Sequence, residues 1–164
     1  MDVLEGSRYV DIHCHCVPGI DDGPETMLNG LALCRALVKD GIDTVIATPH
    51  QLGRYNGFND AQKIRDSVRE LNERLERNDI ALKVFPGGDV RVDERICRLI
   101  EEDKVLTLAD GGKYILLELP GEVFIDIEPL ILGLLSLGIR TIISHPERHV
   151  ILSKRRKALR LARP

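Results

Sequence analysis

The chain has 164 residues, 43% of them hydrophobic and 30% charged, which indicates one globular domain and excludes a disordered chain. Its 23 basic and 26 acidic residues leave a net charge of -3, and this near-balance argues against nucleic-acid binding and against a polybasic membrane binder. Residues 1–10 contain no signal-peptide stretch, and the apolar segment Ile125–Ile139 is too short to span a bilayer. The four cysteines are expected as free thiols in a cytoplasmic protein.

The first elements alternate strand and helix. Tyr9–Cys16 predicts a strand, in which apolar residues alternate with polar ones. Pro24–Lys39 predicts a helix with Pro24 in its first turn and Gly41 at its end. Asp43–Thr48 is a β-branched run that predicts a second, buried strand.

The middle of the chain repeats this order after a polar loop at Gln51–Asn59. Asp60–Arg77 predicts a helix, because its apolar residues recur at steps of three and four. Leu82–Phe85 predicts a third strand and Asp93–Glu102 a third helix.

The last elements are a strand at Tyr114–Leu119, a helix at Ile125–Leu137 and a fifth strand at Thr141–Ser144. Strands that alternate with helices predict an α/β fold with a parallel sheet. Two architectures remain open on this pattern, a doubly wound open sheet and a (βα) barrel.

Side chains that can bind metals follow the predicted strands. Four of the five histidines stand at or just past a strand's carboxyl end, as do Asp89 and Glu118. Parallel barrels build their active sites at that edge. The candidate metal ligands are His13, His15, Asp22, His50, Asp89, Glu118 and His145.

Neighbouring residues refine these candidates. His13 and His15 are two apart on a strand, so both imidazoles point to one face, which suits two ligands on one ion. Cys14 and Cys16 then face the helix layer, and we interpret them as small core residues rather than zinc ligands. The ordinary interpretation of Asp21–Asp22 is an N-terminal cap for the following helix, and metal binding is compatible with it, because one carboxylate can cap while the other binds metal.

Most single candidates also have an ordinary interpretation: His50 as a loop histidine, Asp89 as a turn residue and Arg148 as a solvated arginine. Glu118 lies within the apolar run 115–119, and a carboxylate buried there needs a cation or a donor. Imidazoles together with carboxylates suit Mn²⁺, Zn²⁺ or Fe²⁺, and this many ligands indicates more than one ion. Such sites hydrolyse phosphate esters, with Arg148 as a phosphate partner.

Five motifs carry a resemblance to a known superfamily. They are Asp11-Ile12-His13-Cys14-His15, Asp21-Asp22-Gly23-Pro24, Ala47-Thr48-Pro49-His50, Leu117-Glu118-Leu119-Pro120 and Ser144-His145-Pro146-Glu147-Arg148-His149. Over Val10–His149 the chain resembles the PHP (polymerase and histidinol phosphatase) superfamily. Within it, the chain is most similar to the bacterial protein-tyrosine phosphatases that accompany capsule and exopolysaccharide tyrosine kinases.

The resemblance implies a distorted barrel of seven βα units, of which this chain would hold about five. It also implies two or three metal ions, usually Mn²⁺, with Zn²⁺, Fe²⁺ or Co²⁺ as alternatives. The implied ligand groups are His13, His15 and Glu118 for one ion, Asp22, His50 and Asp89 for a second, and His145, with Glu118 bridging, for a third. Arg148 and Arg54 would bind the phosphoryl oxygens. No cysteine nucleophile is needed, and the chain has no Cys-x5-Arg loop.

Two departures from the family's pattern stand out. The family usually has glutamate at the position of Asp89, one methylene longer. Its last strand ends in an Asp-x-His motif, whereas residues 150–164 contain no Asp, Glu or His. We therefore expect a C-terminally incomplete phosphatase domain at 1–149 and a basic tail at 150–164, with the first and fifth strands left as edges.

The expected activity is metal-dependent hydrolysis of phosphotyrosine on a protein, with the tail of a bacterial tyrosine kinase as partner. No nucleic acid and no stable membrane insertion are expected, and an oligomer stays open. Two alternative functions also stay open: a PHP phosphatase for a small ester such as histidinol phosphate, and an inactive truncated remnant. An amidohydrolase ranks lower, because that class favours lysine where this chain has Glu118.

Overall fold

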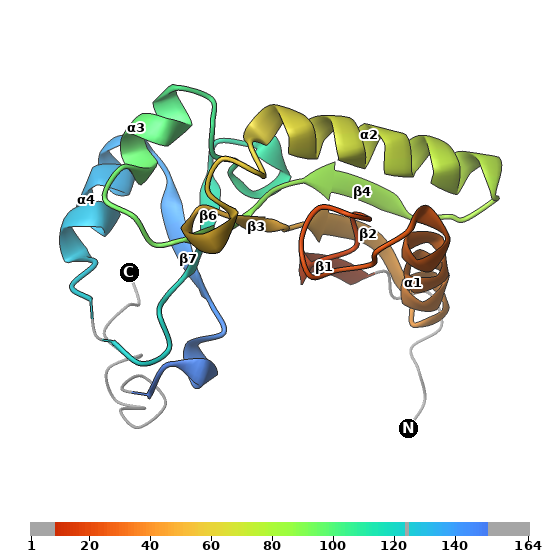
Figure 1. Cartoon of the computed structure of the whole chain (residues 1–164), viewed down its shortest axis with the longest axis horizontal. Helices are drawn as coiled ribbons and strands as arrows, with labels where there is room; N and C mark the ends of the chain where they lie inside the picture. The colour runs from red at the N-terminus through yellow and green to blue at the C-terminus, as the bar shows by residue number, and fades with distance from the viewer. Residues whose placement is uncertain (1–8, 124, 151–164) are drawn as a thin grey trace.

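The computed structural model describes residues 9–123 and 125–150 as a mixed α/β fold with two parallel sheets (Figure 1). The first sheet has the order β1 (Tyr9–Cys14), β2 (Ile42–Ala47) and β4 (Lys83–Pro86). The second has the order β3 (His50–Gln51), β5 (Asp89–Arg91), β6 (Tyr114–Glu118) and β7 (Arg140–Ser144). Every pairing between these strands is parallel, as the alternation of strands and helices predicted. The predicted basic tail lies outside the described residues, except for Val150.

Two chain segments pass from the first sheet into the second. β2 leads into β3 through Thr48 and Pro49, and β4 leads into β5 through Gly87 and Gly88. Backbone hydrogen bonds continue the pairing at the bend, from Thr48 N to Cys14 O (2.8 Å) and from Asp89 N to Pro49 O (3.1 Å). The described residues therefore hold two strands that the sequence analysis did not predict, because β3 follows the predicted second strand and β5 follows the predicted third.

The predicted loop at Gln51–Asn59 is also corrected at its start. Gln51 belongs to β3, and Gly53–Tyr55 forms a short 3-10 helix, η1. The Gln51 side chain is buried, and its amide nitrogen donates to Asn59 O (3.0 Å) while its oxygen accepts from Leu106 N (2.9 Å). A buried polar side chain with these partners fixes the loop against the sheet.

The bend between β4 and β5 requires glycine because the backbone there lies against other chain segments. A Cβ on Gly87 would lie 2.8 Å from Ile46 Cγ2, and one on Gly88 would collide with the side-chain oxygen of Gln51. The two glycines therefore let β5 start directly beside β3, which brings Asp89 opposite His50 in the parallel register.

Substituting Gly88 with alanine is expected to lower the free energy of unfolding by about 2 kcal/mol, because the new methyl group displaces the buried Gln51 amide. Urea denaturation followed by circular dichroism measures this change. The control is Gly111→Ala, where a Cβ would lie 3.4 Å from Leu108 O in exposed, ordinary backbone. Equal stability changes in the two variants would contradict the proposed close approach.

Within residues 9–123 and 125–150, the α-helices agree with the sequence prediction in number and order, but not at every end. They are α1 (Met27–Lys39), α2 (Ala61–Arg77), α3 (Ile96–Glu101) and α4 (Glu128–Ser136). α2 begins as predicted, since the Asp60 carboxylate caps it by accepting from Lys63 N at 2.8 Å. The placement of Pro24 in the first turn of α1 is wrong, because Thr26 is the N-cap and its hydroxyl accepts from Asn29 N.

The third and fourth helices are shorter than predicted because aspartates turn the chain before each of them. The Asp93 carboxylate accepts from Arg95 N at 2.9 Å, and that of Asp126 accepts from Glu128 N at 3.0 Å. Such local side-chain bonds offer the backbone an alternative to the helix. The helices predicted from the sequence pattern therefore began a few residues too early.

Two hydrophobic cores support the bent sheet. α1 and α2 pack on the first sheet, where the predicted face of α2 is buried through Ile64, Val68 and Leu71. α4 packs on β7 and α3 packs on α4, and both helices contribute to the second core (Figure 1). Cys14 and Cys16 belong to the first core, as interpreted from the sequence.

β1 and β7, the first and the last strand in the sequence, are edge strands, as the sequence predicted. Within the described ranges, β1 pairs with β2 alone and β7 with β6 alone. Apolar side chains are exposed on β1, with Tyr9 52% and Val10 59% accessible. None of the helices in residues 9–123 and 125–150 combines the length and the apolar character that crossing a membrane requires.

Candidate metal centre

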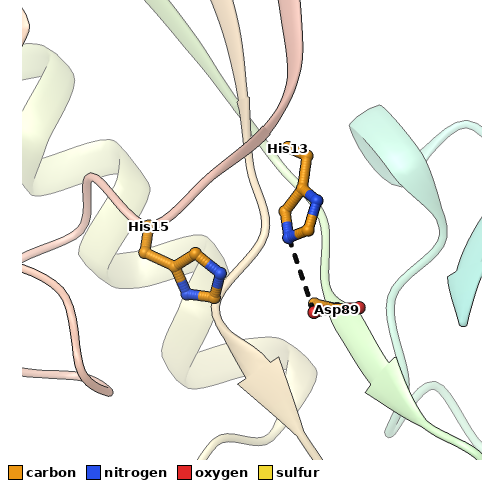
Figure 2. A group of neighbouring side chains, drawn as sticks. All are labelled: His13, His15 and Asp89. Atoms are coloured by element: carbon orange, nitrogen blue, oxygen red, sulfur yellow. Dashed lines mark ion pairs between the residues drawn. The ribbon is translucent and has the colours of Figure 1, made fainter. Parts of the chain in front are cut away.

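The bend in the sheet gathers six of the seven predicted metal ligands. Three groups have possible ligand atoms within 4.8 Å of one another: His13, His15 and Asp89; His15, Asp22 and His50; and His50, Asp89 and Glu118. Figure 2 shows the first group, in which His13 from β1 points at Asp89 from β5. Shared members join the groups into one cluster. This grouping differs from the one that the resemblance implies, which places Glu118 with His13 and His15.

The distances inside the cluster fit a shared cation better than hydrogen bonds. His13 Nε2 lies 3.5 Å from Asp89 Oδ2, and His50 Nδ1 lies 3.6 Å from the same oxygen and 3.7 Å from Glu118 Oε2. Two ligand atoms that each lie about 2.1 Å from one ion, at a tetrahedral angle, are about 3.4 Å apart. A good hydrogen bond between them would be about 2.9 Å long.

Buried polar atoms at the centre of the cluster have no hydrogen-bond partner. They are His13 Nε2, His50 Nδ1 and both carboxylate oxygens of Asp89, whose side chain is 1% exposed. Burial by itself raises the pKa of Asp89, but its contacts with His13 and Ser144 outweigh this and hold the pKa below its usual value. A buried carboxylate without donors is costly unless a cation is near. The residues present therefore fit a divalent metal with nitrogen and oxygen ligands.

Asp21 holds this cluster in place, a role that differs from the predicted helix cap. Its buried carboxylate lies 2.6 Å from His15 Nδ1 and accepts from the backbone nitrogens of His50 (3.0 Å) and Gly23 (3.1 Å). The interpretation of this aspartate pair as a helix cap is wrong, because the N-cap of α1 is Thr26. A carboxylate on Nδ1 fixes the ring and leaves Nε2 for a metal.

The contact between Asp21 and His15 changes the pKa of both groups. Burial raises the pKa of Asp21, but the hydrogen bonds from His15 and from the His50 backbone lower it by more, so the pKa lies below its usual value. Burial lowers the pKa of His15, while the hydrogen bond to Asp21 and the neighbouring carboxylates raise it by more. These opposite shifts both favour the charged pair of His15 and Asp21.

A cavity of about 660 Å³ opens beside the cluster. Its walls include both predicted phosphate-binding arginines, Arg54 in η1 and Arg148 in η3 (Pro146–Arg148). Arg54 pairs with Asp22 at 3.1 Å and lies 4.8 Å above the ring of Tyr55. His145 lines the cavity too, and its ring lies 4.7 Å from that of His13, outside the three compact groups.

Two further cavity residues were missed by the sequence analysis. The Tyr55 ring stacks on His50, with centroids 5.5 Å apart and planes 11° from parallel. Arg91 pairs with Glu118, with Nη1 3.2 Å from Oε1. The sequence did contain a signal for Arg91. It lies two residues after Asp89, so on one strand both side chains are expected on the same face.

The family described as "Capsular polysaccharide synthesis, CpsB/CapC" matches residues 9–162 of the chain. The chain belongs to this family. Among its CpsB/CapC relatives, tyrosine-protein phosphatase YwqE of Bacillus subtilis (strain 168) is 38% identical over 143 residues, which cover 85% of this chain and 55% of that protein. A putative tyrosine-protein phosphatase CapC of Staphylococcus aureus is 30% identical, covering 85% of this chain and 54% of the relative. The chain thus spans about half the length of the curated relatives it matches.

A solved structure supports the same family. It is described as belonging to YwqE from Bacillus subtilis and CpsB from Streptococcus pneumoniae, "unique metal-dependent tyrosine phosphatases". The match has a TM-score of 0.86 at 34% identity, and covers 92% of this chain and 61% of the other. The resemblance to capsule-associated tyrosine phosphatases is therefore confirmed, and so is the mixed α/β fold with parallel sheets. The role of each predicted ligand stays a prediction.

Proposed function

We propose that this CpsB/CapC-family chain hydrolyses phosphotyrosine on proteins with the help of divalent metal ions. The observation that carries the proposal is the cluster of buried, unpartnered ligand atoms on His13, His50 and Asp89. The cavity beside this cluster has Arg54, Arg91 and Arg148 in its walls, and arginines recognise phosphate oxygens in pairs of hydrogen bonds. Its volume of about 660 Å³ suits a ligand group of aryl phosphate size.

The proposed ligands for two or three ions are His13, His15, Asp22, His50, Asp89, Glu118 and His145. Mn²⁺ is the proposed metal, with Zn²⁺, Fe²⁺ or Co²⁺ as alternatives that the same donor types accept. Such ions, when bound, neutralise phosphoryl charge and make water more acidic. Arg148 and Arg54 hold the phosphoryl oxygens, and Asp21 orients the His15 ring.

The proposal extends to the architecture of the chain, to its partner and to its compartment. We propose that residues 1–149 form part of a PHP-type (βα) barrel and that 150–164 form a basic tail. The strand order supports this, because β1, β2 with β3, β4 with β5, β6 and β7 lie side by side in the order in which they occur in the sequence. The proposed partner is the phosphotyrosine-bearing tail of a bacterial tyrosine kinase in capsule or exopolysaccharide synthesis, and the proposed compartment is the cytoplasm.

The decisive experiment compares substrates and metals. Purified chain is treated with a chelator, reloaded with Mn²⁺, Zn²⁺ or Mg²⁺, and assayed for phosphate release. We expect release from a phosphotyrosine peptide with Mn²⁺, at least about tenfold faster than from the matching phosphoserine peptide. Preference for histidinol phosphate would assign a small-ester phosphatase instead. Bound metal without any turnover would contradict the proposed activity.

A further inference from the structure

Arg91 is a cavity residue whose position is set by the sheet. It ends β5, so its side chain projects from the same face as that of Asp89, two residues earlier. In the parallel register Arg91 stands opposite Glu118 on β6. Their side chains meet, with Arg91 Nη1 3.2 Å from Glu118 Oε1, and both line the cavity. The strand that supplies a candidate ligand thus also supplies a cation.

The loop that follows β3 is shaped to leave room for the stem of Arg91. A Cβ on Gly53 would lie 3.0 Å from Arg91 Cγ and 3.3 Å from Arg91 Cβ, closer than the side chain can accept without moving. Gly53 has φ +54, and Leu52 before it has φ 65 and ψ -165, a combination that is costly for a residue other than glycine. Strained backbone of this kind gathers at functional sites, where surrounding packing maintains it.

The guanidinium of Arg91 has donors beyond the one that meets Glu118. Arginine offers five N–H donors in a planar fork, and the ion pair uses the Nη1 side. The Arg91 side chain is 36% exposed, compared with 70% for Arg54. Charges nearer the interior interact more strongly with an anion, because water screens them less.

We propose that Arg91 binds the phosphoryl group of the substrate and, through the same guanidinium, positions Glu118. The substrate class in this inference rests on the proposed function. Contact with Oε1 turns the other carboxylate oxygen of Glu118 toward His50, where Oε2 lies 3.7 Å from Nδ1. Arg91 thereby connects anion binding to Glu118, whereas Arg54 pairs with Asp22, a member of a different ligand group.

The test measures binding of inorganic phosphate to the Mn²⁺-loaded chain by titration calorimetry, with metal content determined by mass spectrometry. Arg91→Gln is expected to weaken phosphate binding about 10- to 100-fold at unchanged metal content, since it removes charge-assisted hydrogen bonds. Arg91→Lys restores the charge but not the fork, and is expected to recover part of the loss. The matched control is Arg95→Gln, which removes an arginine paired with Asp93 outside this cavity.

A second variant protects the test against misfolding of Arg91→Gln. Gly53→Ala keeps Arg91 but displaces its stem, and is expected to weaken phosphate binding less than Arg91→Gln does. With an aryl phosphate substrate, each variant should raise KM by the factor by which that variant raises the Kd for phosphate.

Wild-type phosphate affinity in Arg91→Gln overturns the inference, and so does a wild-type chain that binds no phosphate. A loss that disappears at saturating Mn²⁺ shows a purely structural role and overturns it too. Phosphate binding that depends on Arg91 in a chain without phosphatase activity would refute the proposed function and leave the inference standing.

Discussion

Replacing Asp89 with asparagine is expected to remove bound metal and activity together. Asp89 belongs to two of the three ligand groups, and both of its oxygens are buried without hydrogen-bond partners. A neutral amide is a poor ligand for hard cations, so we expect phosphatase activity to fall about 100-fold or more. We also expect the thermal stabilisation by Mn²⁺ to disappear, which in the wild type amounts to about 2.7 kcal/mol at 100 times the Kd. Metal analysis, kinetics and thermal denaturation measure the three effects.

The matched control for this prediction is Asp79→Asn. Asp79 is exposed and has φ 52, a conformation that asparagine accepts as readily as aspartate. We expect the control to keep its metal content, its activity and its stabilisation by Mn²⁺. A metal content in Asp89→Asn equal to that of the control would show that Asp89 is not a ligand.

Replacing Asp21 with asparagine is expected to weaken both the fold and the metal site. The carboxylate serves His15 Nδ1 and two backbone nitrogens, and an amide has one oxygen to accept all three bonds. At least one buried donor then loses its partner, which costs about 1 to 3 kcal/mol of unfolding free energy. Because Asp21 orients His15, Mn²⁺ affinity should fall about 10- to 100-fold. Urea denaturation and metal titration measure the two changes.

The dependence of stability on pH distinguishes Asp21 from a merely buried residue. The folded pKa of Asp21 is lowered, so its contribution is present above the unfolded value of about 3.9 and is lost as pH falls through the folded pKa. The folded pKa of His15 is raised, so its contribution is present below about 6.5 and is lost as pH rises through the folded pKa. In chelator-treated protein the difference between wild type and Asp21→Asn should therefore be largest between about pH 4 and 6.5. A difference that does not vary with pH would contradict the charged contact.

The ligand candidates were predictable because their placement depends on local pattern. The spacing of His13 and His15 predicts side chains on one side of the chain, although β1 itself ends at Cys14, and Glu118 ends an apolar run that a parallel sheet buries. Parallel strands in turn present their carboxyl ends at one edge, so residues far apart in the sequence were expected together. The family resemblance added Arg54, which the structure places in the cavity wall beside Asp22 and Arg148.

The bends and the supporting residues were not predictable in the same way. The Gly87–Gly88 bend depends on how closely β4 approaches Ile46 and Gln51, which are distant in sequence. Asp21 reads as a helix cap next to a helical pattern, and its contacts with His15 and His50 exist only once two strands lie side by side. Local propensity has no information about either approach, because both are contacts between segments.

By itself, the sequence of this protein determined the order of its main strands and helices, the metal-compatible residue types at the strand ends and the motifs that resemble the PHP superfamily. Only the tertiary structure decided how these ligands are shared. It joins Asp89 to His13 as well as to His50, and it pairs Arg91 with Glu118 across neighbouring strands. The reason is physical: periodicity fixes the face on which a side chain lies, whereas distances between side chains depend on strand register and on the bend of the sheet.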